Sequence, residues 1–216
     1  MLAKWVIRGT AMMASILFLT GCGSSGIDAD EVSGVPEDWI TTTKEGWPES
    51  KSFGSSTPIL TRDDCELLDD PPEILGSTPD FTDTGWAALG SDPNDQDAYR
   101  YRCSIWSRDN YAGEIELLHP GSDTEAQDLI TEFKNQPSTA EQDNSATTET
   151  VGDLDVHVVE RWYPTNPQGR YLALFYDEDA EVLVKLDISS LDKADFDAFS
   201  AQKAADTLID VIAAGS

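Results

Sequence analysis

The stretch "YRYRCSIW", residues 99–106, decides the fold. Apolar or aromatic side chains alternate with polar ones along it, and this period of two is typical of a β-strand with one face buried and one face open to water. One face carries Tyr99, Tyr101, Cys103 and Ile105, and the other carries Arg100, Arg102 and Ser104. We therefore expect a β-sheet, whose other strands should lie in the neighbouring sequence.

Four further segments have the composition of strands. Residues 112–119, "AGEIELLH", follow a short turn at residues 108–110, so the two segments predict a hairpin. Three more strands are expected at residues 154–163, 170–176 and 180–188. The loops between these three are too short for a crossover helix, which indicates antiparallel pairing.

Two helices are expected beside this sheet. Ser122 and Glu125 form a capping box, apolar residues follow at helical spacing, and Pro137 ends the run. A second helix is expected over residues 191–213, where an apolar stripe faces a charged one. The polar residues 137–152 read as an exposed loop. The fold class is therefore α+β: an antiparallel sheet of about five strands with two helices packed on it, forming a single extracytoplasmic domain at residues 61–216.

The first 21 residues have the pattern of a bacterial secretory leader. Lys4 and Arg8 precede a short apolar run at residues 11–19, which is too short to cross a membrane. The four residues Leu19-Thr20-Gly21-Cys22 resemble the lipobox of bacterial lipoproteins. The resemblance implies cleavage before Cys22 and attachment of a diacylglyceryl group to its thiol. The alternative is an ordinary signal peptide with an incidental cysteine.

Residues 22–60 have the composition of a lipid-anchored flexible tether. They are rich in Gly, Ser, Thr, Pro and acidic residues and show no periodic apolar pattern. Trp39, Ile40, Trp47 and Phe53 are unusual in a linker, so part of the segment could pack on the domain. The expected location is the extracytoplasmic face of the cell membrane, where two or three acyl chains are sufficient for stable anchoring.

The cysteine count agrees with this interpretation. Three cysteines cannot all pair with one another in an exported protein, because the number is odd. Lipid attachment to Cys22 leaves Cys65 and Cys103 to form a disulfide. In the chain-entropy model, closing a loop of this length stabilises the fold by roughly 4 kcal/mol. A metal site is the competing interpretation, but the cysteine spacing and the two histidines do not favour it.

The net charge of −27 restricts the possible partners. Loss of Lys4 and Arg8 with the leader makes the mature chain more acidic by two charges. Such a surface repels nucleic acid and anionic headgroups, so we expect no nucleic-acid partner. A basic protein is a possible partner, and a merely solvated acidic surface is the alternative.

No catalytic, metal or cofactor site is predicted. His119 precedes Pro120-Gly121 at a turn and His157 is expected to face solvent, so neither completes a nucleophilic triad. Residues 92–99 match a calcium loop poorly, and the acids at 177–179 are better explained as a hairpin turn. Chemistry that uses only carboxylates, as in an acid-rich hydrolase, is the remote alternative.

The tryptophans are the remaining candidates for binding. Trp86, Trp106 and Trp162 are possible groove residues, because exposed aromatic rings can stack on sugars or cover an apolar ligand. Trp86, inside the expected disulfide loop, is the preferred candidate, whereas Trp106 and Trp162 fall within strands, where a core position is the more frequent role. The sequence therefore predicts a non-catalytic interaction or ligand-binding domain. The main alternative is a carrier that holds a lipid or another apolar small molecule between its helices and sheet.

One family resemblance covers roughly residues 60–214. Cys65-Glu66-Leu67-Leu68, then Arg102-Cys103-Ser104-Ile105-Trp106 and a helical C-terminus, are similar to a family of small actinobacterial lipoproteins that carry a domain of unknown function. The tryptophan stands one position later here than in the simplest form of that motif. The resemblance implies a PsbP-like α+β fold with a structural cysteine pair, and it implies no catalytic residue.

Overall fold

The structure is a computed structural model that describes residues 32–50, 52–55, 64–108 and 111–215. The expected signal peptide and the lipidation site Cys22 lie outside the described residues. Among the helices of the described part, none is both long and apolar enough to cross a membrane.

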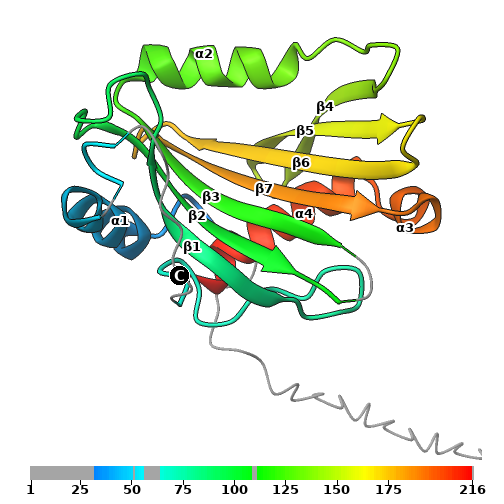
Figure 1. Cartoon of the computed structure of the whole chain (residues 1–216), viewed down its shortest axis with the longest axis horizontal. Helices are drawn as coiled ribbons and strands as arrows, with labels where there is room; N and C mark the ends of the chain where they lie inside the picture. Colours follow the sequence, from blue (N-terminus) through cyan, green and yellow to red (C-terminus); the bar gives the residue numbers. More distant parts are fainter. Residues whose placement is uncertain (1–31, 51, 56–63, 109–110, 216) are drawn as a thin grey trace, which may run out of the picture.

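A single antiparallel sheet of seven strands organises the described chain (Figure 1). The strands lie side by side in the order β1-β2-β3-β7-β6-β5-β4, so the hairpin β6–β7 inserts between β3 and β5. Their bounds are β1 (Asp80–Ala88), β2 (Ala98–Trp106), β3 (Ala112–Pro120), β4 (Asp143–Val151), β5 (Leu154–Tyr163), β6 (Gln168–Asp177) and β7 (Val182–Leu191).

The predicted α+β class with an antiparallel sheet is confirmed, but the predicted number of five strands is wrong. The five expected strands correspond to β2, β3, β5, β6 and β7. The two that the sequence did not reveal, β1 and β4, are the edges of the sheet. β4 lies inside residues 137–152, which were expected to be a loop. An edge strand packs against one neighbour only, so its burial pattern is irregular or largely exposed and the alternation is weak.

The described part of the chain has four helices, and the expected number of two is wrong. α2 (Asp123–Lys134) begins at the predicted cap, where the Ser122 side chain accepts a hydrogen bond from the Glu125 N–H. The helix expected over residues 191–213 is divided into α3 (Lys193–Ala198) and α4 (Ala201–Ala214). The backbone is extended at Phe199, and Ser200 caps the new helix by accepting from the Lys203 N–H.

The fourth helix, α1 (Glu37–Glu49), lies within the segment expected to be a tether. Trp39 and Trp47 are buried against the domain, and the Trp47 ring stacks on Tyr99 with 5.5 Å between ring centroids. The Trp47 indole N–H also donates to the Asp95 carbonyl at 2.9 Å. Residues 37–49 therefore form part of the packed structure and differ from the flexible tether expected over residues 22–60.

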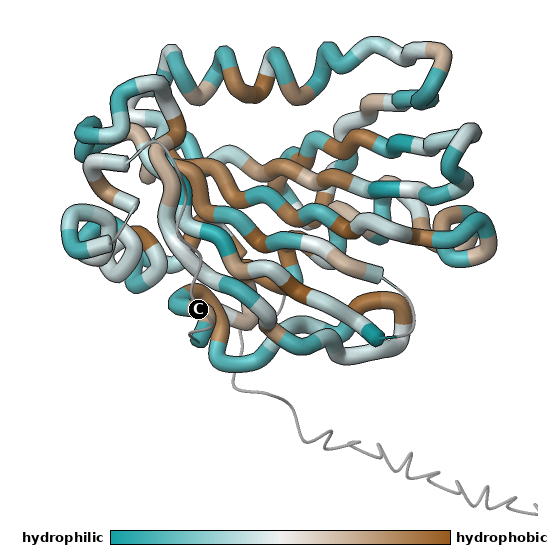
Figure 2. Tube along the Cα trace, viewed as in Figure 1, coloured by the Kyte–Doolittle hydropathy of each residue, from teal (hydrophilic) through white to brown (hydrophobic). Residues whose placement is uncertain are grey.

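The two faces of the sheet carry separate apolar clusters. The larger one fills the space between the sheet and α4, and its members include Ile115, Val184, Leu186 and Ile209. The smaller one lies between the opposite face and α2, around Leu118, Leu183 and Ile130. The central strands β6 and β7 are consequently apolar on both faces over part of their length, and hydrophobic residues gather in the middle of the sheet in Figure 2.

Cys65 and Cys103 form the disulfide that the sequence predicted, with 5.7 Å between their Cα atoms. Cys103 lies on β2 with its side chain in the larger cluster, and Leu67 and Leu68 are buried beside it. The bond therefore joins the segment preceding β1 to the central part of the fold.

Candidate functional site

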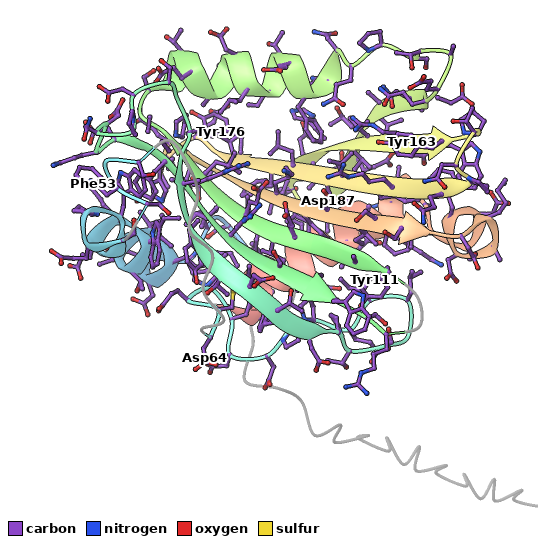
Figure 3. All side chains as sticks on the ribbon, viewed as in Figure 1. Phe53, Asp64, Tyr111, Tyr163, Tyr176 and Asp187 are labelled. Atoms are coloured by element: carbon purple, nitrogen blue, oxygen red, sulfur yellow. A yellow bond between two sulfur atoms is a disulfide. The ribbon has the colours of Figure 1, made fainter. Side chains whose placement is uncertain are left out.

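The sheet face that carries α2 is covered by this helix over one part only. Beyond α2, the strands present charged and polar side chains where the other face is apolar; we call this region the open face. Its members are Arg100, Arg102, Ser104, Trp106, Glu114, Glu116, Arg170, Lys185, Asp187 and Ser189. Figure 3 shows Asp187 on β7 in this region, away from α2.

Glu116 occupies the middle of the open face and is fully buried. Arg100 Nη1 donates to its Oε1 at 3.1 Å, and Lys185 donates to its Oε2. Burial alone would raise the pKa of the Glu116 carboxyl, but the charges of Lys185 and Arg100 outweigh burial and leave the pKa below its ordinary value. Glu116 is therefore held as a carboxylate, and its two ion pairs join its own strand, β3, to β2 and to β7.

A second ion pair joins β6 to β7. Arg170 Nε donates to Asp187 Oδ1 at 2.8 Å, and its Nη2 donates to Oδ2, so the contact is bidentate. This hydrogen bonding raises the pKa of Arg170. A further ion pair joins β2 to β3, where Arg102 Nη1 donates to Glu114 Oε1 at 3.1 Å. Burial, followed by the neighbouring Glu116, raises the pKa of Glu114 despite the Arg102 charge.

These ion pairs border a groove of about 390 Å³ in the open face. Its lining residues are Thr82, Ser104, Ile105, Trp106, Ala112, Gly113, Glu114, Arg170, Asp187 and Ser189. Trp106 is 46 % exposed and is the one large hydrophobic side chain that is exposed among the described residues. The groove therefore combines a flat aromatic surface with two carboxylates, a guanidinium and hydroxyl groups.

Two β-bulges shape this end of the sheet. Thr82 is an extra residue of β1, because Phe81 pairs with Ile105 and Asp83 already pairs with Ser104. A second irregularity sets Ser189 and Ser190 of β7 against Arg170 alone, and Ser190 has a left-handed φ of 63°. Bulges are over-represented next to functional sites, where they redirect side chains. Here both irregularities supply residues to the groove.

The three tryptophans proposed from the sequence do not form one groove. Trp106 lines the groove just described. Trp86 lies on the opposite face, where its indole N–H donates to the Thr43 carbonyl of α1 at 3.0 Å and its ring contacts Tyr101. Trp162, on β5, packs on Phe196 with 5.2 Å between centroids. Trp106 and Trp162 are also separated by β3, β7 and β6 in the sheet.

The two histidines lie on different faces of the sheet. The expectation that His119 occupies an exposed turn is wrong: it is buried, its Nε2 lies 3.1 Å from Thr43 Oγ1, and its ring stacks on Tyr99. Burial, with a smaller contribution from Lys44, lowers its pKa to about 4. His157 is half-buried, with Nδ1 3.0 Å from Thr148 Oγ1, and burial lowers its pKa as well.

The acidic segment at residues 177–179 forms the hairpin turn that the sequence predicted. Asp177 Oδ1 accepts from the Asp179 and Ala180 N–H groups at 3.1 and 3.0 Å, and Oδ2 accepts from the Val35 N–H at 2.7 Å. Within the part of the chain that the structure describes, no three His, Cys, Asp or Glu side chains are grouped so as to hold a metal ion.

Comparisons of the chain with family models, with curated proteins and with solved structures found no match. Sequence reasoning identified Trp106 and the polar alternation of Arg100 and Arg102, but it did not identify Glu114, Arg170 or Asp187 as their neighbours. In the sequence, charged side chains recur at alternate positions of three separate strands. Only the order of these strands in the sheet brings the side chains together.

Proposed function

We propose that this protein is a lipid-anchored extracytoplasmic domain that binds a ligand or partner through the groove beside Trp106, without catalysis. The single observation that carries the proposal is the open face itself. Half of one sheet face is covered by α2, whereas the other half has a concave surface with an exposed tryptophan and fixed polar groups. Concave sites with a few placed polar groups and aromatic side chains are typical of ligand-binding surfaces.

The carboxylates of the groove favour binding over hydrolysis. Both oxygens of Asp187 accept hydrogen bonds from Arg170, so its carboxylate is engaged where a nucleophile or base must be free. Glu114 has a raised pKa but is paired with Arg102. His119 lies on the other face of the sheet. The groove therefore offers oriented hydrogen-bonding groups whose carboxylates are each engaged by an arginine, which supports binding.

The interior gives less support to the alternative of an apolar carrier. The space between α4 and the sheet, where the carrier hypothesis places its ligand, holds a continuous cluster of buried side chains. Leu208 and Ile209 of α4, and Leu186 and Ile188 of β7, are almost completely buried in it. A ligand of lipid size would have to displace these contacts, whereas the groove beside Trp106 is accessible without any rearrangement.

The anchor is tested by labelling cells that express the full chain with an alkyne fatty acid. We expect the label on the wild-type protein and on the control C65A/C103A, and none on Cys22→Ser. The wild-type protein should also partition into the detergent phase after temperature-induced separation. Label that persists on C22S, or an unlabelled wild type that still carries residues 1–21, would contradict the anchored state.

The binding surface is tested by a photo-crosslinking amino acid placed at position 106 in the full chain, expressed in its own cells. The matched control places the same amino acid at Thr147, which is exposed on β4 at the far edge of the sheet. We expect a discrete crosslinked product at position 106 and not at 147. The same product, or none, at both positions would refute the assignment of the groove.

A further inference from the structure

We infer that the groove beside Trp106 takes a neutral saccharide. This inference rests on the proposed function, because it names the ligand class for the same binding surface. It is carried by three properties of the groove: the balance of its charges, the exposed aromatic face, and the arrangement of its hydrogen-bonding groups.

The two ion pairs that border the groove balance in charge, although the chain is strongly acidic and the open face as a whole carries one more cation than carboxylates. Asp187 is paired with Arg170 and Glu114 with Arg102, so the two carboxylates of the groove are matched by two guanidinium groups. The chain as a whole carries −27. An anionic ligand would have to compete with Asp187 for Arg170, and a cationic ligand would have to compete with Arg102 for Glu114. A neutral polar ligand can hydrogen-bond to both pairs without breaking them.

Trp106 supplies the apolar part of such a site. Its ring is nearly half exposed, whereas Trp39, Trp47 and Trp86 are buried or packed against other side chains. A pyranose ring has one face of C–H groups, and these pack well on an indole while the hydroxyls at the ring edge stay polar. A purely apolar ligand would satisfy Trp106 but would cover the polar groups of Arg170 and Glu114, which is costly.

The polar groups surround the tryptophan with both donors and acceptors. A guanidinium has five N–H donors, and Arg170 uses two of them on Asp187. Glu114 uses Oε1 on Arg102 and so keeps an acceptor oxygen for a ligand. Ser104, Ser189 and Thr82 add hydroxyl groups to the lining. A sugar hydroxyl both donates and accepts, so it can pair with either kind of group.

The test measures the intrinsic fluorescence and iodide quenching of the full chain in detergent. It is titrated to millimolar concentrations with neutral hexasaccharides of glucan, galactan, mannan and arabinan, and with a hexamer of galacturonate as the charged comparison. Because Trp106 is the one exposed tryptophan among the described residues, a bound saccharide should protect the fluorescence from iodide. Trp106→Ala should weaken binding by about tenfold or more, since burial of an aromatic side chain contributes at least that factor.

Two matched variants separate stacking from folding. Trp106→Phe keeps an aromatic face and should retain binding within about threefold, whereas Thr147→Ala on β4 should leave it unchanged. Affinity for the neutral saccharide should change by less than about twofold between 50 and 500 mM salt, because screening acts on interactions between charges. Tighter binding of the galacturonate, or a large salt dependence, would overturn the inference.

Failure of this inference and failure of the proposed function give different results. If no neutral saccharide protects Trp106 but the crosslinker at position 106 captures a protein, the saccharide assignment is overturned and the binding surface stands. If there is neither protection nor a specific crosslink, both are overturned. Release of shorter sugars from a bound hexasaccharide would confirm the ligand class and contradict the non-catalytic assignment.

Discussion

Replacing Glu116 with Gln tests the network that holds the open face in shape. Glu116 is 0 % exposed, and its two oxygens accept from Arg100 and Lys185, whose side chains are 34 % and 19 % exposed. Removing one partner of a buried ion pair costs about 3–5 kcal/mol. Because both cations reach water and the amide keeps one acceptor oxygen, we reduce the expected loss of unfolding free energy to about 2 kcal/mol.

The effect of Glu116→Gln should also depend on pH in one direction. The pKa of Glu116 is lowered in the folded state, so its contribution is complete above the unfolded pKa, which is about 4.3. That contribution is lost as the pH falls through the folded pKa. The difference between wild type and E116Q is therefore largest near neutral pH and shrinks in acid below about pH 4.

Urea unfolding followed by tryptophan fluorescence measures this difference at pH 7 and at a series of lower pH values. The matched control is Glu132→Gln on the exposed face of α2, which should change stability by less than about 0.5 kcal/mol. A loss below about 0.5 kcal/mol for E116Q at pH 7, or a difference that grows in acid, would refute the account of this network.

Three further predictions concern the fold. Replacing both Cys65 and Cys103 with Ala should lower the unfolding free energy, measured in urea, by roughly 4 kcal/mol for their separation of 38 residues. Adding reductant to the wild type should cause an equal loss. No loss from either change would show that the disulfide does not stabilise the fold. Trp47→Ala should cost about 3–5 kcal/mol by the same assay, whereas a loss under about 1 kcal/mol would mean that α1 is dispensable. The pKa of His119 is lowered to about 4 in the folded protein, so the unfolded chain takes up this proton at a higher pH than the folded chain. Up to about 3 kcal/mol of unfolding free energy should therefore be lost as the pH falls from about 6.5 to 4. An NMR titration that gives His119 an ordinary histidine pKa would disprove this.

The parts of the fold that the sequence predicted are those whose patterns are local. β2 alternates because one of its faces is buried and the other is polar, and α2 begins at a capping box that uses only Ser122 and Glu125. The edge strands β1 and β4 were missed because burial imposes little pattern on them. The break at Ser200 was missed because the apolar stripe continues through it, so that α3 and α4 resemble one helix.

The candidate site was less predictable because it depends on strand order. The sequence favoured Trp86 as the groove residue and a core position for Trp106, but it is Trp106 that lines the groove. α1 covers Trp86, and its helical structure was hidden by a linker-like composition. Arg170 and Asp187 are 17 residues apart, and they lie near Trp106 because β7 of the β6–β7 hairpin pairs with β3, a strand distant in sequence.

The most direct test of the central claim is hydroxyl-radical footprinting of Trp106 in intact cells and in the purified full chain. The claim is that the groove is occupied at the membrane. We expect Trp106 to be oxidised several times more slowly in cells than in the purified protein, with Tyr163 and Tyr176 oxidised at similar rates in both. Equal oxidation of Trp106 in the two preparations would show that the groove stays empty and would contradict the account.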